Sequence, residues 1–460
     1  MKHVFFLLWI GIGCSWSLAQ KDLQEFSYEN FMKQVMEHHP YAYRAEIVQQ
    51  MGTSNLLTSR GAFDPRVFGN IDQKYFDDKQ YYSRTYGGLK IPTWYGVSVE
   101  AGYSQNEGVF LNPENRTPDA GLWYAGLRVE LGNGLIINQR RATFEQAKLQ
   151  AEITGIERTI LLNELQRDAS VSYWKWQQAY FELRVYEQAF ENAQFRLDAV
   201  KQAALFGDRP YIDTLEASMN LRNRSISLLQ ARNTLLNAEL KVEFYLWSNG
   251  FIPLELENAF PEEQRESTSS VLLSHLDSVL IHHPFLQIEA LNVAQQKVDL
   301  QWKREQLKPK ITLAYNLINE PISGNPLSNY SPANYTWGAS LSYPILTRKE
   351  RGGVQMSRLK LQDQELKLKT TMADLRYTIG ATLNAYTTLI DQLEETRKFT
   401  ELNQAMYDAE ITLFSLGESS IFMINSRESE WLKAQIQLIR VHAEQQTMFS
   451  ELQYQMMAHS

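Results

Sequence analysis

A tandem duplication constrains what this chain can fold into more than any other feature of its sequence. The tripeptide His-His-Pro occupies residues 38–40 and recurs at residues 282–284, an offset of 244 residues. Pro65 and Pro309, which follow in the two halves, keep the same offset. A matched order at a fixed offset predicts two copies of one structural unit, with Pro40 equivalent to Pro284 and Pro65 to Pro309.

Two further pairs of residues support this repeat at a second offset. Gly207 and Gly417 lie 210 residues apart, and so do Arg141 and Arg351, which precede the long helical patterns. The two offsets, 244 and 210, differ by 34 residues. The first half should therefore carry extra residues between Pro65 and Arg141.

The first residues of the chain predict an export signal over residues 1–19. A positively charged start and an apolar run are followed by small residues that suit cleavage after Ala19. Cys14 leaves a second interpretation open, in which this cysteine is lipidated. The exported chain would then divide into a first repeat over residues 20–264 and a second repeat over residues 265–460.

The composition excludes several classes of function. The 460 residues carry a formal net charge of −8, so nucleic acid is not an expected partner. Cys14 is the only cysteine, which excludes a disulfide framework and a cysteine-based metal site. After the signal, no uncharged apolar stretch reaches the roughly 20 residues that a transmembrane helix needs. Any membrane crossing must therefore use β-strands.

Each His-His-Pro separates two helical patterns. A short helix should begin at Ser27, which can cap it, and its counterpart in the second half should begin at Ser270. Proline cannot continue a helix but suits the first turn of a new one, so fresh helices are expected over residues 41–62 and 285–307. Metal binding is an alternative role for the paired histidines, and we prefer capping and packing.

The pattern changes to a period of two within residues 63–134 and again within residues 311–344. Apolar residues alternate there with small or polar ones, and Tyr, Trp and Gly are frequent, which is typical of β-strands. Alternating segments of about 10 residues with aromatic ends and long polar loops indicate a transmembrane β-barrel. A soluble β-hairpin domain is the alternative, and the flanking helices of an exported chain favour the membrane.

Long helical patterns follow each strand region and turn back at a glycine. They cover residues 138–206 and 211–247 in the first half, and residues 355–416 and 420–457 in the second. At about 1.5 Å per residue, the longest of these helices measures roughly 100 Å. An antiparallel rod of this kind exposes an apolar stripe that one chain cannot bury, so copies of the chain should assemble.

The extra residues of the first half are long enough for two more strands. Residues 81–89 and 94–103 are the candidates, with residues 90–93 as the turn between them. Six strands per chain would result if both crossed the membrane. The preferred interpretation keeps four membrane strands and makes the extra residues an extended external hairpin.

With these features together, the sequence resembles the TolC family of outer-membrane efflux proteins over nearly all of residues 23–457. The marks are His-Pro before a helix, Pro before the first strand, and Phe-Gly or Leu-Gly before an apolar helix, each present twice. The resemblance implies a mixed α/β membrane protein. Long antiparallel coiled-coil helices would form a periplasmic α-barrel, topped by a transmembrane β-barrel that three chains share.

The resemblance also implies a function and partners. The chain would be a homotrimeric exit duct in the cell outer membrane, in contact with lipid and with a large periplasmic portion. A periplasmic adaptor protein and an inner-membrane pump would supply small molecules, which the duct conducts passively. The alternatives are the channel of a type I protein secretion system and a non-conducting coiled-coil tether. No catalytic residue, metal site or cofactor is expected, and the chain should not be an enzyme.

The glycine turns are the expected functional sites. The predicted periplasmic tip and adaptor contact consist of Gly207, Asp208, Arg209, Gly417 and Glu418. Members of the family often carry acidic residues just past the second turn, where they line the narrowest point of the pore. This sequence departs from that pattern with Met423 and Ser426, whereas Asp213 takes the equivalent place in the first half. The carboxylates at these turns have an alternative role as solvated groups at the positive end of a helix.

Overall fold

A computed structural model describes residues 24–256, 258–263, 280–321, 325, 328 and 330–457. The expected export signal, Cys14 and the short helix expected from Ser270 lie outside these described residues. The chain divides into two compact units, and each unit takes segments from both halves of the sequence. We call residues 40–167, 269–385 and 451–460 the sheet unit, and residues 1–39, 168–268 and 386–450 the hairpin unit.

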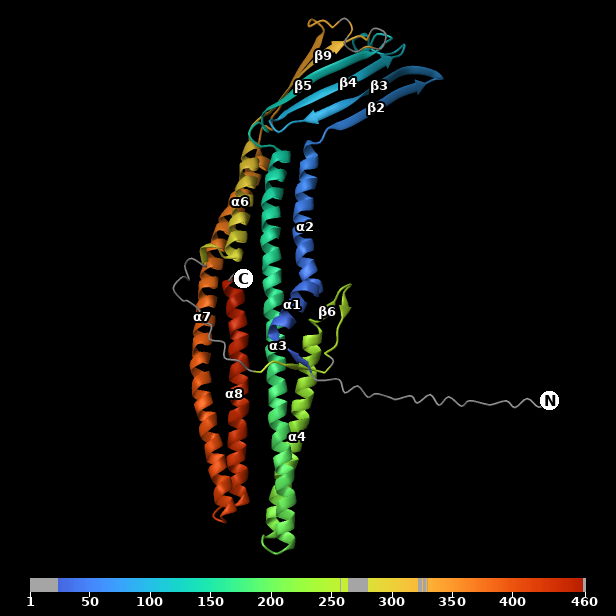
Figure 1. The fold of residues 1–460 in the computed structure, drawn as a ribbon. Coiled ribbons are helices and arrows are strands. Elements are labelled where there is room, and N and C mark those ends of the chain that lie inside the picture. Colours follow the sequence, from blue (N-terminus) through green and yellow to red (C-terminus); the bar gives the residue numbers. More distant parts are fainter. Residues whose placement is uncertain are drawn as a thin grey trace, which may run out of the picture. The chain divides into compact units, whose positions relative to one another are not determined.

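The sheet unit contains one six-stranded sheet (Figure 1). Its strands are β2 (Arg66–Phe76), β3 (Lys79–Pro92), β4 (Val97–Glu107), β5 (Leu122–Gly132), β9 (Lys310–Asn319) and β10 (Tyr335–Ser342). The order across the sheet is β10-β9-β5-β4-β3-β2, and every neighbouring pair is antiparallel. The second half of the sequence therefore adds its two strands to the four of the first half.

The extra residues of the first half lie inside this sheet, so the preferred extended external hairpin is wrong. Leu89 of β3 pairs with Val67 on one side and with Ala101 on the other, which puts β3 and β4 level with their neighbours. The turn between them falls at residues 93–96, later than expected. Pro92 is tolerated as the last residue of β3, because a strand end needs no N–H for the ladder.

The β3–β4 turn lies at the end of the sheet that joins the helices. The Trp94 ring packs on Phe63, with centroids 4.9 Å apart, and on Phe144 at 5.0 Å. Thr93 fixes the turn, since its hydroxyl donates to the Val97 carbonyl at 2.7 Å. Both strands of the extra hairpin therefore run the length of the sheet.

The two faces of the sheet differ sharply in polarity. Residues that pair across an antiparallel ladder share a face, and even numbers pair with even numbers throughout, except past a bulge between Lys74 and Tyr75. The odd-numbered face, here called the apolar face, has a charged strand residue only at one strand end, Glu107. Lys79 lies past the bulge and pairs with Phe76, so it belongs to the even-numbered face. Its larger apolar residues are Val67, Ile71, Leu89, Ile91, Val97, Val99, Tyr103, Trp123, Leu127, Val129, Leu131, Ile311, Leu313, Tyr315, Leu317, Tyr335, Trp337 and Leu341.

The four prolines of the repeat stand at element boundaries. Pro40 is the first residue of α2 (Pro40–Arg60), and Pro284 is the first residue of α6 (Pro284–Glu305). Pro65 directly precedes β2, and Pro309 directly precedes β9. A fixed φ suits the first turn of a helix, and the missing N–H costs nothing there.

Two long helices, α3 (Gln139–Leu205) and α7 (Arg348–Ser415), contribute residues to both units. The prediction that the second long helix begins at residue 355 is wrong, because α7 begins at Arg348. Gly352 and Gly353 lie in its first turns. Each glycine costs a helix about 1 kcal/mol relative to alanine, and the remaining residues of the helix outweigh that cost.

The hairpin unit is built on α1 (Tyr28–His38), α4 (Tyr211–Glu243) and most of α8 (Ile421–Met456), together with parts of α3 and α7. Short strands complete it: β1 (Gln24–Phe26) is parallel to β8 (Ala259–Pro261), and β6 (Trp247–Ser248) is antiparallel to β7 (Ile252–Pro253). Its core contains Phe31, Tyr173 and Trp176, whose side chains are fully buried. Within the described ranges, no helix is long and apolar enough to cross a membrane.

Candidate functional site

The two hairpins of the hairpin unit turn through the same backbone motif. The N–H of Gly207 donates to the Ala204 carbonyl at 3.2 Å, and the N–H of Asp208 donates to the Ala203 carbonyl at 2.9 Å. These two bonds form a Schellman motif, which ends a helix with a residue of positive φ. Gly207 has a φ of +81°, and a Cβ added there would meet nothing within 4 Å. The backbone angle alone therefore requires glycine at this turn.

The second turn repeats the first bond for bond. Gly417 donates to the Phe414 carbonyl at 3.1 Å, and Glu418 donates to the Leu413 carbonyl at 3.0 Å. The φ of Gly417 is +80°, again with nothing within 4 Å of an added Cβ. The sequence therefore located both turns correctly, at Gly207 and Gly417.

The charged residues at the turns differ in their surroundings. The side chains of Asp208 and Glu418 are exposed. The Arg209 guanidinium lies over the Phe414 ring, 4.4 Å from its centroid, and its Nη1 is 3.8 Å from the Asp213 carboxylate. Arg209 thus joins the α3–α4 hairpin to the α7–α8 hairpin and holds Asp213 beside the turn.

Met423 and Ser426, the expected lining of the pore, lie on the exposed side of α8. Met423 is 36 % exposed, whereas Ile424, the next residue, is only 4 % exposed. No described contact brings them together with Asp213, and their role in an aperture stays a prediction.

A buried ion pair joins the hairpins at a level that the sequence interpretation missed. The Arg196 guanidinium of α3 donates to both carboxylate oxygens of Glu428 of α8, at 2.8 and 2.9 Å. Arg196 also donates to the Asn425 side chain at 2.7 Å, and Arg224 of α4 lies 3.7 Å from Glu428. Since the Tyr407 hydroxyl of α7 is 3.3 Å from Glu428, the cluster links all four helices.

The protonation states of this cluster follow from its burial. Burial lowers the pKa of Arg196, but the hydrogen bonds and the charge of Glu428 outweigh that effect and leave the pKa raised. Burial, followed by the charge of Glu428, raises the pKa of Tyr407 to about 12. Tyr407 therefore stays a neutral hydroxyl, and Arg196 carries the positive charge that Glu428 balances.

The sequence pattern indicates that Glu428 is a buried carboxylate, but it does not identify the residue that pairs with it. Glu428 falls in the helical stripe of buried residues that includes Ile421, Ile424 and Leu432. A carboxylate in an apolar stripe needs a cation beside it. Arg196 lies 232 residues earlier, so the pairing could not be read from local spacing.

Two helices of the hairpin unit expose apolar residues at spacings of three, four and seven. On α4 these residues are Ile212, Leu215, Met219, Ile226, Leu229, Leu236 and Leu240, each at least half exposed. On α7 they are Phe399, Leu402, Met406 and Leu413. This spacing is the a/d pattern of a coiled coil, and we call the two rows the α4 seam and the α7 seam.

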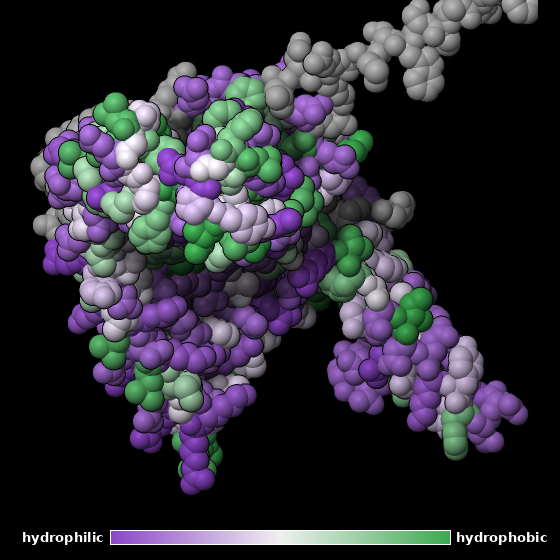
Figure 2. Space-filling view, turned by 90° about the horizontal axis from the view of Figure 1, so that it is seen from below, coloured by the Kyte–Doolittle hydropathy of each residue, from purple (hydrophilic) through white to green (hydrophobic). Residues whose placement is uncertain are grey.

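Hydrophobic residues also gather at the turns themselves. Leu205, Phe206 and Leu416 are each 69 % or more exposed, and Tyr211 just past the first turn is 74 % exposed. The face viewed from the side of these turns shows hydrophobic patches among hydrophilic residues (Figure 2).

The paired histidines have structural surroundings. His39 is 2 % exposed and stacks on Tyr245, with ring centroids 5.5 Å apart. His283 caps α6, because its Nδ1 accepts from the Phe285 N–H at 3.3 Å while its Nε2 lies 2.8 Å from the Gln455 carbonyl. In the part of the chain that the structure describes, no cluster of three His, Cys, Asp or Glu residues could hold a metal ion.

Comparison with known proteins identifies the fold. No protein-family model matches the sequence, and no curated protein matches it. Solved structures do match. The outer-membrane channel OprN has a TM-score of 0.70 at 13 % identity, covering 93 % of this chain and 89 % of its own. The outer-membrane protein VceC of Vibrio cholerae has a TM-score of 0.67 at 10 % identity, covering 93 % and 95 %.

A third match is the CmeC outer-membrane channel of Campylobacter jejuni, with a TM-score of 0.65 at 12 % identity, covering 93 % of this chain and 85 % of its own. Nearly the whole of the present chain thus has the fold of these outer-membrane channels. The overall chain fold that the resemblance to the TolC family implies is therefore confirmed.

Proposed function

We propose that this chain is the outer-membrane exit duct of a tripartite efflux system. It conducts small molecules passively from an inner-membrane pump and a periplasmic adaptor to the outside of the cell. The observation that carries the proposal is the two-faced sheet. Its apolar face exposes Val67 at 85 %, Trp337 at 72 % and Leu341 at 70 %, and an apolar face of this extent needs a lipid surface. The opposite face is charged and needs water.

A closed barrel is the second part of the proposal. In the described chain, β2 and β10 are the two edges of the sheet, and an unpaired strand edge is not tolerated in lipid. The backbone N–H and C=O groups of both edge strands are hydrogen-bonded if β10 of one copy pairs with β2 of the next. Three copies of a six-stranded sheet then close a single barrel, with more strands than the four per chain that the resemblance implies.

A trimer also provides partners for the helices. The α4 seam and the α7 seam remain exposed in one copy, and each carries the pattern that packs against another helix. We assign the α4 seam of one copy to the α7 seam of its neighbour. The helices then form a closed periplasmic tube, and the exposed residues at the turns are left for an adaptor protein.

The adaptor contact is assigned to the two turns. Gly207, Asp208, Arg209, Gly417 and Glu418 form it, with the exposed Leu205 and Phe206 beside them. Asp213, Met423 and Ser426 are assigned to the narrowest point of the tube. A bulky substitution at Asp208 or Glu418 should abolish drug tolerance while trimers still assemble, and wild-type tolerance would contradict the assignment.

Single-channel recording tests the duct against its alternatives. Purified trimers in a planar bilayer should show discrete conductance steps, and the absence of conductance even with the adaptor present would support a non-conducting tether. A type I secretion channel would conduct as well. It is distinguished by a deletion strain that loses export of one secreted protein while its tolerance to small toxic compounds is unchanged.

A further inference from the structure

The polar face of the sheet carries an excess of positive charge. Its basic strand residues are Arg66, Lys74, Lys79, Arg84, Lys90, Arg128 and Lys310, and its acidic strand residues are Asp72, Glu100 and Glu130. Seven cations therefore share this face with three carboxylates, although the whole chain has a net charge of −8. The sign of this face is opposite to that of the protein.

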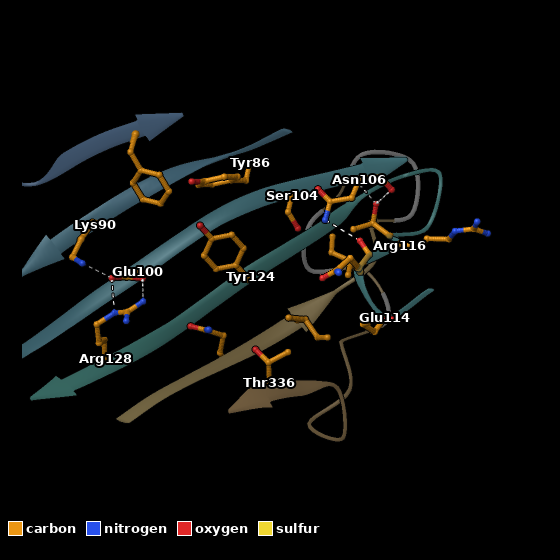
Figure 3. A pocket seen from close by; sticks show the side chains of 16 residues that line it. Tyr86, Lys90, Glu100, Ser104, Asn106, Glu114, Arg116, Tyr124, Arg128 and Thr336 are labelled. Atoms are coloured by element: carbon orange, nitrogen blue, oxygen red, sulfur yellow. Dashed lines mark hydrogen bonds and ion pairs between the residues drawn. The ribbon is translucent and has the colours of Figure 1, made fainter. Parts of the chain in front are cut away.

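The centre of this excess is a cluster of three charged groups on β3, β4 and β5 (Figure 3). The Lys90 Nζ is 2.7 Å from Glu100 Oε1. The Arg128 guanidinium makes a bidentate contact with the same carboxylate, with Nε 3.1 Å from Oε1 and Nη2 3.2 Å from Oε2. One carboxylate thus holds two cations, and the cluster keeps one positive charge.

The cations, rather than the carboxylate, face the open side of the cluster. The Lys90 and Arg128 side chains are 39 % and 41 % exposed, whereas Glu100 is 13 % exposed. They line a hollow of about 610 Å³ on the polar face, together with Tyr86, Tyr124 and the loop residues Glu114 and Arg116, whose charges balance each other. A solute beside this wall meets guanidinium and ammonium groups before it meets the carboxylate.

Each cation ties Glu100 of β4 to a different neighbouring strand, and the second cation also gives the wall a net charge. A single Lys90–Glu100 or Arg128–Glu100 pair would cross-link two strands and leave the wall neutral. Here Glu100 fixes both cations in place, so the wall has a rigid positive group. Charged groups on a narrow aqueous passage with low-dielectric walls raise the local concentration of ions of the opposite sign.

We propose that the polar face makes the outer-membrane section of the duct selective for anionic solutes, with Lys90 and Arg128 as the groups that set the preference. The proposal rests on the proposed function, since the polar face must line a passage. In a trimer, three copies of the cluster form a positive ring at one level of the passage. Negatively charged molecules, or those with a carboxylate or phosphate group, are the cargo class that this ring favours.

The test measures reversal potential across a planar bilayer that contains the purified protein, with unequal KCl concentrations on the two sides. The expected ratio of chloride to potassium permeability is above unity for the wild type. It should fall toward unity in Lys90→Gln and below unity in Lys90→Glu. Lys33→Gln removes a lysine from an exposed position of α1, in the hairpin unit, and should leave the ratio unchanged.

The outcomes separate this inference from the function on which it rests. The anion preference should weaken as salt rises, because the screening length is about 10 Å at 0.1 M and about 3 Å at 1 M. A conducting wild type that prefers potassium, or a ratio that Lys90→Gln and Arg128→Gln leave unchanged, overturns the inference while the duct stands. A bilayer that never conducts overturns both.

Discussion

Arg196 and Glu428, which are 232 residues apart in sequence, form a bidentate ion pair in which Glu428 is only 1 % exposed. Arg196 itself is 14 % exposed, so water screens little of the attraction. The pair joins the two helical hairpins above their turns.

Removing one partner of this pair should loosen the hairpins. Glu428→Ala leaves the Arg196 charge buried and unbalanced, which costs about 3–5 kcal/mol for a buried pair. Hydrogen exchange of the backbone amides around residues 205–215 and 412–424 should accelerate accordingly. Glu430→Ala is the matched control, because Glu430 lies two residues away and pairs with Lys433 in a contact whose side chains are 52 % and 71 % exposed. Equal exchange in the two variants would contradict the prediction.

The glycines of the two turns should be sensitive to a single methyl group. Gly207→Ala and Gly417→Ala place a Cβ on a backbone with φ near +80°, at a cost of roughly 1–2 kcal/mol each. Gly155 of α3 provides the control, since an added Cβ meets nothing within 4 Å and no positive φ is involved. Gly155→Ala should raise the melting temperature slightly, while the two turn variants lower it. A turn variant that melts with or above the wild type would show that the motif is dispensable.

Stability should decline in mild acid through the buried histidines. Burial lowers the pKa of His39 and of His283, although backbone hydrogen bonds to Phe244 and Gln455 oppose the shift. The pKa of an unfolded histidine is about 6.5. Below about pH 6.5 the unfolded chain therefore binds more protons than the folded chain, in which the pKa is lower. The stability present above that pH is then lost as the pH falls toward the folded pKa.

The pH dependence can be assigned with one substitution. A proton on His283 Nδ1 would also remove the acceptor that caps α6 at Phe285. His283→Gln should therefore melt with a smaller change between pH 7.5 and 5.5 than the wild type. His282→Gln alters the neighbouring exposed histidine and should keep the full change. Identical pH profiles for the wild type and His283→Gln would exclude His283 as a source.

A new positive charge should reduce trimer assembly when it is placed on the apolar face of the sheet and should be tolerated on the polar face. Ala101→Lys puts an ammonium group on the apolar face of β4, and a lysine facing lipid near the bilayer centre costs about 2–4 kcal/mol. Ser104→Lys, on the same strand, adds the same group to the polar face. The yield of outer-membrane trimers should fall for Ala101→Lys and hold for Ser104→Lys. Comparable yields would show that the apolar face does not contact lipid.

The turns and helix starts of this structure could be predicted from the sequence, because they depend on single residues and their immediate neighbours. Gly207 and Gly417 were recognised because a turn of positive φ needs glycine, and Pro40 and Pro284 because proline starts helices. The six-stranded sheet could not be predicted in the same way, because it depends on which strands pair. Leu89, for example, is opposite Val67 on one side and Ala101 on the other only once the strands have paired.

The sites were less predictable than the fold for the same reason. Arg196 and Glu428 lie in separate helices, and no local pattern connects them. The Lys90–Glu100–Arg128 cluster joins three strands, so the position of each residue on an even-numbered face was visible only after the register was known.

The apolar face of the sheet has a consequence for how the chain is made. A freshly synthesised copy in water presents this face together with two bare strand edges, a combination that drives self-association into insoluble aggregates. Under the proposed function, the helices can fold in water, whereas the sheet reaches its final form only when its apolar face contacts lipid and its edge strands pair with those of other copies. The yield of assembled protein should therefore be limited by how well the chain is kept soluble and inserted into the membrane. Overproduction should give intracellular aggregates before the membrane is saturated with protein.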